Sequence, residues 1–231
     1  MTILNAEGVV KRYPGKFALN GLTMTLEEGR IAGLFGPNGS GKTTFLRMVA
    51  GLAHPTRGKL AICGEPMGWR TRAHVAYLPD SDFLLDWMRV REAGKIYARL
   101  YDDFDGRRYE KLLEFMQLEP GQTFKSLSRG MREKLGLALT LSRRARLIVL
   151  DEPLGGVDPI AREQILGAII REFRADSSML ITSHLIREFE TVVDEAFYLK
   201  DGRIALSGDT ETLREQRGKS LDEFYREVFA Q

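Results

Sequence analysis

Two observations predict an α/β fold with a mostly parallel sheet. Short apolar runs typical of strands alternate with segments whose apolar residues recur at helical spacing, and this alternation indicates a parallel sheet. A glycine-rich loop motif at residues 36–43 lies between one such strand and one such helix. A block of helical pattern at residues 84–145 interrupts the alternation, so we expect a helical subdomain inserted into the α/β core.

The first 83 residues read mainly as strands. A turn dipeptide, Pro14-Gly15, joins the first two strands into an antiparallel N-terminal layer. The strand Ile31–Phe35 leads into the glycine-rich loop, and the helix after the loop ends at Gly51. The predicted strands of this part are residues 3–13, 16–27, 31–35, 58–63 and 74–78.

The helical block and the strands after it complete the core. Helices are predicted at residues 90–100, 109–118 and 129–144, the last with Ser128 as its N-cap. The continuous apolar run at 146–150 indicates a strand buried on both faces. Further expected elements are a helix at 160–173, a strand at 178–182, a short helix from Leu185, a strand at 195–199 and one or two amphipathic helices in 208–231. We expect a single domain, with its α/β core at 1–83 and 146–231.

Composition excludes several classes of protein. Lys and Arg number 34 and Asp and Glu 32, a net charge of +2, so the chain lacks the basic footprint typical of nucleic-acid binding. The single cysteine, Cys63, excludes an intrachain disulfide framework and suits a reducing compartment. Residues 2–7 lack the features of a signal peptide, and no apolar run approaches the about 18 residues of a membrane span. We expect a cytosolic protein that can still dock on a membrane protein.

The loop at residues 36–43, Gly-Pro-Asn-Gly-Ser-Gly-Lys-Thr, fits the phosphate-binding pattern G-x-x-x-x-G-K-[ST]. Its glycines let successive backbone N–H groups point inward as an anion-binding nest, and the following helix aims its positive end at the phosphates. Lys42 supplies a point charge, and the Thr43 hydroxyl is a ligand for Mg²⁺. The sequence thus predicts a P-loop NTPase core that binds the phosphates of a nucleotide through Gly36, Pro37, Asn38, Gly39, Ser40, Gly41, Lys42, Thr43 and Thr44.

Two carboxylates follow the buried strand at 146–150. The carboxyl ends of parallel strands face the crevice in which such folds bind their ligands. Asp151 is placed there to hold Mg²⁺, and Glu152 is placed to act as the general base toward an attacking water.

With these residues, five further segments resemble the nucleotide-binding subunit of an ABC (ATP-binding cassette) transporter, over essentially the whole chain. Residues 127–131, Leu-Ser-Arg-Gly-Met, resemble the family signature Leu-Ser-Gly-Gly-Gln. Ser128 and Gly130 keep that pattern, whereas Arg129 and Met131 depart from it. The segment Tyr77-Leu-Pro-Asp80 resembles one that usually ends in Gln, and its carboxylate can still offer oxygen to Mg²⁺.

The other three segments hold single residues. The resemblance implies that Tyr13 stacks on adenine and that Asp158 belongs to a loop crossing between subunits. It also implies that His184, after a strand, contacts the γ-phosphate. The site expected from the sequence therefore has Glu152 and His184 as catalytic residues, and Thr43, Asp151 and Asp80 as metal ligands.

The resemblance implies ATP and Mg²⁺ as cofactors and two kinds of protein partner. One is a second cassette, identical or different, whose signature closes the nucleotide site head to tail. The other is an integral membrane permease, so that the chain would be peripheral on the cytoplasmic face of the cell membrane. The signature variant and the short tail resemble subunits of bacterial exporters.

Two alternatives stay open at this stage. A soluble ABC protein acting on ribosomes or DNA typically has two cassettes in one chain or a long coiled-coil insertion, and this chain has neither. Glu152 and His184 argue against a nucleotide-binding regulatory module with little turnover, but the unusual Asp80 keeps this alternative open.

Overall fold

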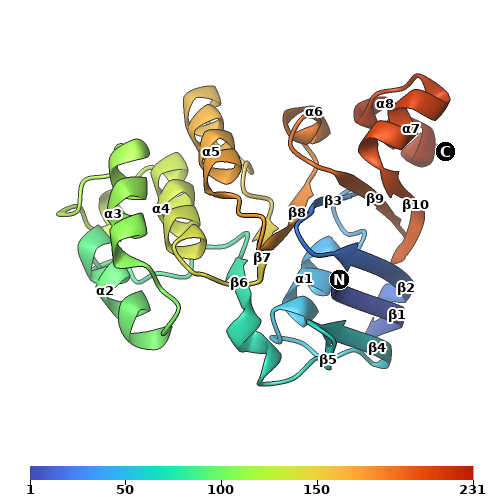
Figure 1. Cartoon of the computed structure of the whole chain (residues 1–231), viewed down its shortest axis with the longest axis horizontal. Coiled ribbons are helices and arrows are strands. Elements are labelled where there is room, and N and C mark those ends of the chain that lie inside the picture. The colour runs from blue at the N-terminus through green and yellow to red at the C-terminus, as the bar shows by residue number, and fades with distance from the viewer. Residues whose placement is uncertain (231) are drawn as a thin grey trace.

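Two β-sheets and the helices that cover them make up the fold (Figure 1). The structure is a computed structural model that describes residues 1–230, apart from the side chains at 216 and 217. The smaller sheet is antiparallel, with the strand order β2-β1-β4-β5. Its strands are β1 (Thr2–Tyr13), β2 (Lys16–Glu27), β4 (Arg57–Ile62) and β5 (Glu65–Pro66).

The larger sheet has six strands in the order β10-β9-β3-β8-β7-β6. It is parallel except for β10, which pairs antiparallel with β9 at the edge. Every residue of β3, β7 and β8 is buried, as expected for strands covered on both faces. The strands are β3 (Ile31–Phe35), β6 (Val75–Leu78), β7 (Leu147–Asp151), β8 (Ser178–Ser183), β9 (Glu195–Lys200) and β10 (Arg203–Asp209). The predicted fold class is confirmed.

Helices cover both faces of the larger sheet. Helix α1 (Lys42–Val49) lies between the two sheets and buries Phe45, Leu46 and Met48 in the core that they share. The face of the larger sheet opposite α1 packs against a second hydrophobic core, to which further helices contribute. They include α4 (Arg129–Leu141), α5 (Pro159–Glu172) and the short α6 (Ile186–Phe189).

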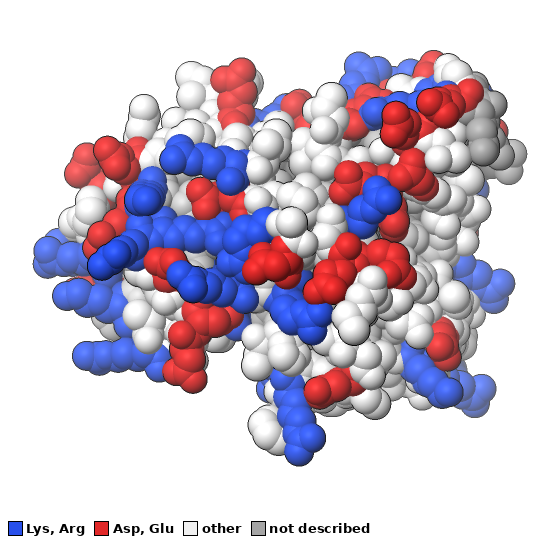
Figure 2. Space-filling view, viewed as in Figure 1, with Lys and Arg blue, Asp and Glu red and all other residues white. Residues whose placement is uncertain are grey.

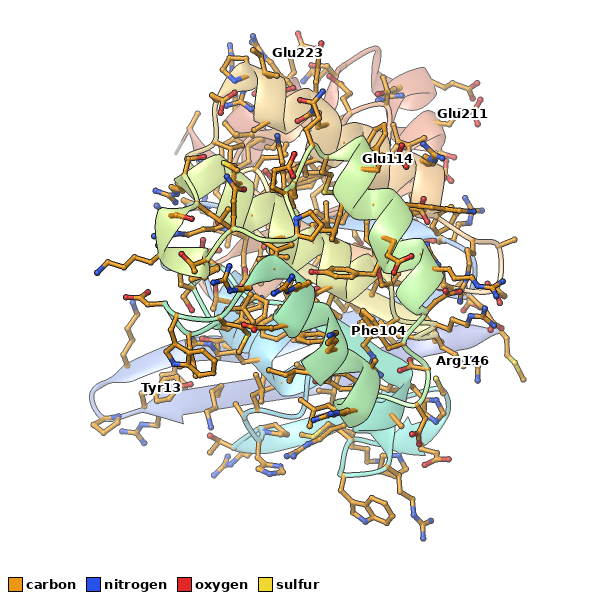
Figure 3. All side chains as sticks on the ribbon, turned by 90° about the vertical axis from the view of Figure 1, so that its left-hand side faces the viewer. Tyr13, Phe104, Glu114, Arg146, Glu211 and Glu223 are labelled. Atoms are coloured by element: carbon orange, nitrogen blue, oxygen red, sulfur yellow. The ribbon has the colours of Figure 1, made fainter. Side chains whose placement is uncertain are left out.

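Three helices gather at one end of the molecule, at the left of Figure 1: α2 (Val90–Leu100), α3 (Gly106–Phe115) and α4. An aromatic cluster joins α2 to α3, because the Phe104 ring contacts both Tyr97 and Tyr109 (Figure 3). The prediction of a helix at 109–118 was displaced by three residues. Asp105 caps the helix by accepting from the Arg108 N–H, and Gln117 just after it has a φ of 57°, which no helix continues through.

The C-terminal region forms two short helices, α7 (Thr210–Arg217) and α8 (Leu221–Phe229). A capping box between Ser220 and Glu223 begins α8. The prediction of one or two amphipathic helices is confirmed up to residue 230, and Gln231 lies outside the described residues. Within the described residues, no helix has both the length and the apolar character needed to cross a bilayer.

Arg143, directly after α4, ties the helical end to the larger sheet. Its buried guanidinium donates to the Val75 and Ala73 carbonyls and forms an ion pair of 2.9 Å with Asp103. Because removing one partner leaves buried polar groups unpaired, we expect Arg143→Ala to lower the free energy of unfolding by about 3 kcal/mol. Arg144→Ala is the matched control, since the ion pair between Arg144 and Asp105 is exposed. This variant should lower the free energy of unfolding by less than about 1 kcal/mol. Chemical denaturation of both variants would test this, and equal losses would contradict it.

Candidate nucleotide-binding site

The loop at residues 36–43 connects β3 to α1, as predicted. Gly41 has a φ of 113°, and a Cβ at that position would lie 2.4 Å from the Ala18 carbonyl oxygen. A Cβ on Gly36 would lie 2.5 Å from the Leu199 carbonyl oxygen. Glycine is therefore required at both positions by close backbone approach, and at Gly41 also by conformation. Gly39, with a φ of 84°, completes the curl of the loop.

The loop contains a buried hydroxyl that has no hydrogen-bond partner among the described residues. Ser40 is 6% exposed, and its Oγ makes no hydrogen bond within the described part of the chain. A buried polar group without a partner is costly. The Ser40 hydroxyl, which lies just before the N-terminus of α1, thus suits a loop that receives an anionic ligand.

Lys42 is the central cation of the site and is only 5% exposed. Its Nζ donates to the carbonyl oxygens of Gly36 at 2.7 Å and Pro37 at 3.3 Å. The same nitrogen lies 3.2 Å from Oε1 of Glu152. Lys42 therefore joins the phosphate-binding loop to the carboxyl end of β7.

Asp151 is hydrogen-bonded from three sides. Its Oδ1 accepts from the hydroxyls of Thr43 at 3.2 Å and Thr182 at 2.8 Å, and its Oδ2 accepts from the Tyr77 hydroxyl at 3.3 Å. Burial raises the pKa of Asp151, and these three hydrogen bonds oppose that shift. Thr182 and Tyr77 were not predicted to belong to the site. Both residues lie near the carboxyl ends of predicted strands, and this position could have pointed to the site. The two strands, β6 and β8, flank β7.

Glu152 and His184 form the next part of the site. Oε2 of Glu152 lies 2.8 Å from His184 Nδ1 and accepts from the His184 backbone N–H at 3.1 Å. Glu152 has a φ of 52°, a strained conformation for a residue with a side chain. Its N–H donates to the Thr182 hydroxyl at 2.9 Å, which holds the bend. The carboxylate is thereby placed between Lys42 and His184.

Asp80 follows β6 and lies near these carboxylates. A Cβ at Gly155 would lie 3.8 Å from Oδ1 of Asp80. Burial raises the pKa of Asp80, and the charges of Asp151 and Glu152 raise it further. Asp80 thus shares the electrostatic environment of the site.

The signature residues form a separate group with Asp158. Ser128 caps α4 by accepting from the Met131 N–H at 3.3 Å, and Asp158 caps α5 by accepting from the Ala161 N–H at 3.0 Å. Gly130 lies between the two caps, since a Cβ there would be 3.3 Å from Asp158 Oδ2. Ser128 and Asp158 are both exposed to solvent.

Tyr13 lies near the turn of the β1–β2 hairpin, at the lower left of Figure 3. It is 43% exposed, and Lys11 Nζ is 5.2 Å from its ring centroid. An exposed ring at this edge can offer its face to a flat ligand.

The oxygen donors near the loop fit Mg²⁺ bound together with phosphates. Mg²⁺ prefers one or two carboxylates and hydroxyls with phosphate oxygens over an all-protein cage. Thr43 and Asp151 supply such a pair. The described residues contain no group of three His, Cys, Asp or Glu side chains arranged to hold a metal by themselves.

Charges of both signs cover the face that Figure 2 shows. Over the helical end at its left, Lys and Arg side chains are intermixed with Asp and Glu. Ion pairs of the described residues include Arg108 with Glu172 at 2.6 Å and Arg144 with Asp105 at 2.8 Å.

Comparisons with known proteins agree on one family. The ABC transporter family profile matches residues 19–155. The Nod factor export ATP-binding protein I of Burkholderia orbicola is 36% identical over 96% of this chain and 76% of its own length. An uncharacterized ABC transporter ATP-binding protein of Bacillus subtilis, YxlF, is 31% identical over 93% of this chain and 74% of its own length.

Solved structures agree in fold. The ATP-binding subunit of an ABC transporter superposes with a TM-score of 0.88 at 26% identity, covering 98% of this chain and 99% of that one. A dimeric ATP-binding cassette in a post-hydrolysis state, bound to ADP and phosphate, has the same fold with a TM-score of 0.81 at 20% identity, covering 90% of this chain and 99% of that one.

Proposed function

This chain belongs to the ABC transporter family as an ATP-binding and ATP-hydrolysing subunit, and we propose that it drives a separate membrane permease through ATP-dependent pairing of two cassettes. One observation carries the proposal. Lys42, Asp151 and Glu152 meet at the carboxyl edge of the larger sheet, with Thr43 and His184 in direct contact with the two carboxylates.

The binding half of the site is formed by the loop and Asp151. The loop N–H groups and Lys42 hold the phosphates of ATP, with Gly36, Pro37, Asn38, Gly39, Ser40, Gly41 and Thr44 forming or flanking the cradle. Thr43 and Asp151 would hold Mg²⁺, with Asp80 as the further candidate ligand. The metal neutralises phosphate charge when bound.

The chemical half is formed by Glu152 and His184. Glu152 accepts a proton from the water that attacks the terminal phosphorus, because its carboxylate is held at the edge of the site by His184 and Lys42. His184 keeps one ring nitrogen on Glu152 through Nδ1, which leaves Nε2 for the γ-phosphate. Its side chain is 48% exposed and so open to a ligand.

A second cassette completes the site. Ser128, Arg129, Gly130 and Met131 lie at the start of α4, and Asp158 beside them starts α5. The positive N-terminus of α4 and the Ser128 hydroxyl suit a γ-phosphate presented by a partner subunit, head to tail. Tyr13 would stack on the adenine of the chain's own ATP. Loss of the γ-phosphate contacts then opens the pair, which is a ligand-driven population shift.

The names of the relatives support the proposed direction of transport. Several are named export ATP-binding proteins, so we propose export, with the chain peripheral on the cytoplasmic face of the membrane. The region 84–145, which holds α2 to α4, would act as a helical subdomain that carries the motion of the nucleotide site to the permease.

Purification from membranes tests the proposal. A tagged chain expressed in its own host and extracted in mild detergent should co-purify with a polytopic membrane protein, and the complex should hydrolyse ATP. A chain found without a membrane protein, in both membrane and soluble fractions, would contradict the permease assignment even if it hydrolysed ATP.

The Thr182 hydroxyl gives a prediction about the metal. Thr182→Val removes the shortest hydrogen bond to Asp151 and leaves the Glu152 N–H unpaired. We expect the Mg²⁺ concentration for half-maximal ATP hydrolysis to rise about 10-fold, as for other loss of support to a metal ligand. Thr140→Val is the matched control, because this buried threonine only donates to Gly136 within α4. A Mg²⁺ series that gave the same midpoint for both variants would refute the role of Thr182.

A further inference from the structure

The segment that carries His184 is short and depends on contacts from other elements. His184 follows β8, and one residue separates it from the four-residue helix α6. A single helical turn is not stable on its own, because its few hydrogen bonds do not offset the cost of nucleation. Ile186 and Phe189 are buried in the second hydrophobic core, so this helix is held by the elements that pack around it.

The C-terminal helix α8 makes two polar contacts with this segment. Oε1 of Glu190, the residue directly after α6, accepts from the Leu221 N–H at 2.7 Å. Nε of Arg187 donates to Oδ2 of Asp222 at 2.9 Å. The Leu221 N–H belongs to the first turn of α8, where no carbonyl of the helix itself can accept it. Glu190 therefore satisfies the start of α8 and fixes the end of α6 against it.

The same helix is anchored to the larger sheet (Figure 1). The Tyr198 hydroxyl, on β9, donates to the Leu221 carbonyl at 2.9 Å in a buried hydrogen bond. Lys200 Nζ, at the end of β9, donates to the Val228 carbonyl at 2.8 Å. β9 lies next to β3, the strand that leads into the phosphate-binding loop. Helix α8 thus connects the strand beside that loop with α6.

These contacts bear on His184 because they fix the helix that follows it. His184 meets Glu152 through both its backbone N–H and its Nδ1, so the position of its backbone sets the direction of its ring. Phe189, Leu221 and Phe224 are fully buried in the same core, so α6 cannot shift away from α8 without opening that core. A change that frees α6 from α8 therefore loosens the backbone that orients His184.

We propose that Glu190 is a positioning residue for ATP hydrolysis, through which α8 braces the segment that carries His184. This role rests on the function proposed above, in which His184 holds Glu152 and contacts the γ-phosphate. Loosening the brace lowers kcat, because the ring of His184 is then less well aligned with Glu152 and with the phosphate. The affinity for ATP changes little, since the loop and Lys42 hold the phosphates independently of α6.

Two substitutions at residue 190 test the brace. Glu190→Ala removes the acceptor of the Leu221 N–H and should lower kcat about fivefold, the scale of one lost hydrogen bond, with KM for ATP unchanged. Glu190→Gln keeps an acceptor oxygen at the same position and should retain the kcat of the wild type. Both variants lose the ion pair of 3.8 Å with Arg214, so that pair cannot explain a difference between them.

The contact at the surface provides a second, matched pair of variants. Arg187 and Arg226 each pair with Oδ2 of Asp222 at 2.9 Å, and both are exposed, but only Arg187 belongs to α6. Arg187→Gln should lower kcat about twofold, as fits an exposed ion pair, whereas Arg226→Gln should leave it unchanged. Because residue 187 is exposed, this test remains decisive if Glu190→Ala does not fold.

Amide hydrogen exchange, followed by mass spectrometry without nucleotide, gives a readout that does not depend on turnover. In Glu190→Ala, the amides of residues 184–190 should exchange about fivefold faster than in the wild type, because this segment opens locally once its hydrogen bond to α8 is lost. The amides of α1, on the other side of the larger sheet, should exchange at the rate of the wild type. A variant that was only less stable overall would exchange faster in both segments.

The outcomes separate this role from the proposed function. Glu190→Ala with the kcat of the wild type, equal losses in Glu190→Ala and Glu190→Gln, or equal effects of Arg187→Gln and Arg226→Gln would overturn the brace. If the wild-type chain did not hydrolyse ATP, the proposed function would fail, while hydrogen exchange would still decide whether α8 holds the segment after His184.

Discussion

Lys42→Ala is expected to abolish tight binding of Mg-ATP, with an affinity loss of about 100-fold or more. Lys42 is buried and is the cation that joins the loop carbonyls to Glu152. Its removal takes away a desolvated charge-assisted contact to the phosphates. It also leaves Glu152 without its cation, so that an unpaired carboxylate would face the polyphosphate. Both effects act in the same direction.

An equilibrium titration with a fluorescent ATP analogue measures the loss. Lys59→Ala is the matched control, since Lys59 is exposed on β4 in the smaller sheet. This variant should bind the ATP analogue as tightly as the wild type. Unchanged affinity in Lys42→Ala would show that the loop is not the nucleotide site. The melting temperature should be recorded for both variants, because a folded Lys42→Ala protein is needed to attribute the loss to binding.

Much of the fold could be predicted from the sequence, because its elements are specified by local pattern. The buried strands β3, β7 and β8 were predicted within one residue at each end, since their apolar runs are short and bounded by turn residues. The strand β10 was not predicted, because its exposed residues alternate with half-buried ones at the sheet edge. The shift in α3 arose because the cap at Asp105 outweighed apolar spacing.

The candidate site also has a part that could be predicted from the sequence and a part that depends on the fold. Lys42, Asp151, Glu152 and His184 could be placed at one edge because each follows a strand whose carboxyl end faces the crevice. The support that Thr182 and Tyr77 give to Asp151 depends on the order of the strands, which brings β8 and β6 to either side of β7. The contacts of α8 with the segment after His184 depend on how the C-terminal helix packs on β9. Neither relation is contained in the spacing of residues along the chain.

Glu152→Gln is expected to keep ATP binding and to lower turnover by about 10²–10⁴-fold, the usual effect of removing a general base. The amide preserves the shape of the side chain and can still accept from the His184 N–H, but it cannot take the proton of the attacking water. The change also removes a negative charge next to Lys42, so the affinity for ATP should be equal to or higher than that of the wild type.

Because hydrolysis is what opens the proposed pair of cassettes, the Glu152→Gln variant should accumulate as a dimer when ATP and Mg²⁺ are added. Size-exclusion chromatography with and without ATP measures this, alongside steady-state phosphate release. Glu188→Gln is the matched control: this carboxylate, four residues beyond His184, pairs with Arg162 at 2.8 Å and takes no part in the site, so turnover should persist and no stable dimer should form. Hydrolysis by Glu152→Gln at the wild-type rate would remove Glu152 from the role of base. A variant that bound ATP without turnover and stayed monomeric would keep the base assignment and contradict pairing of this chain with a second copy of itself.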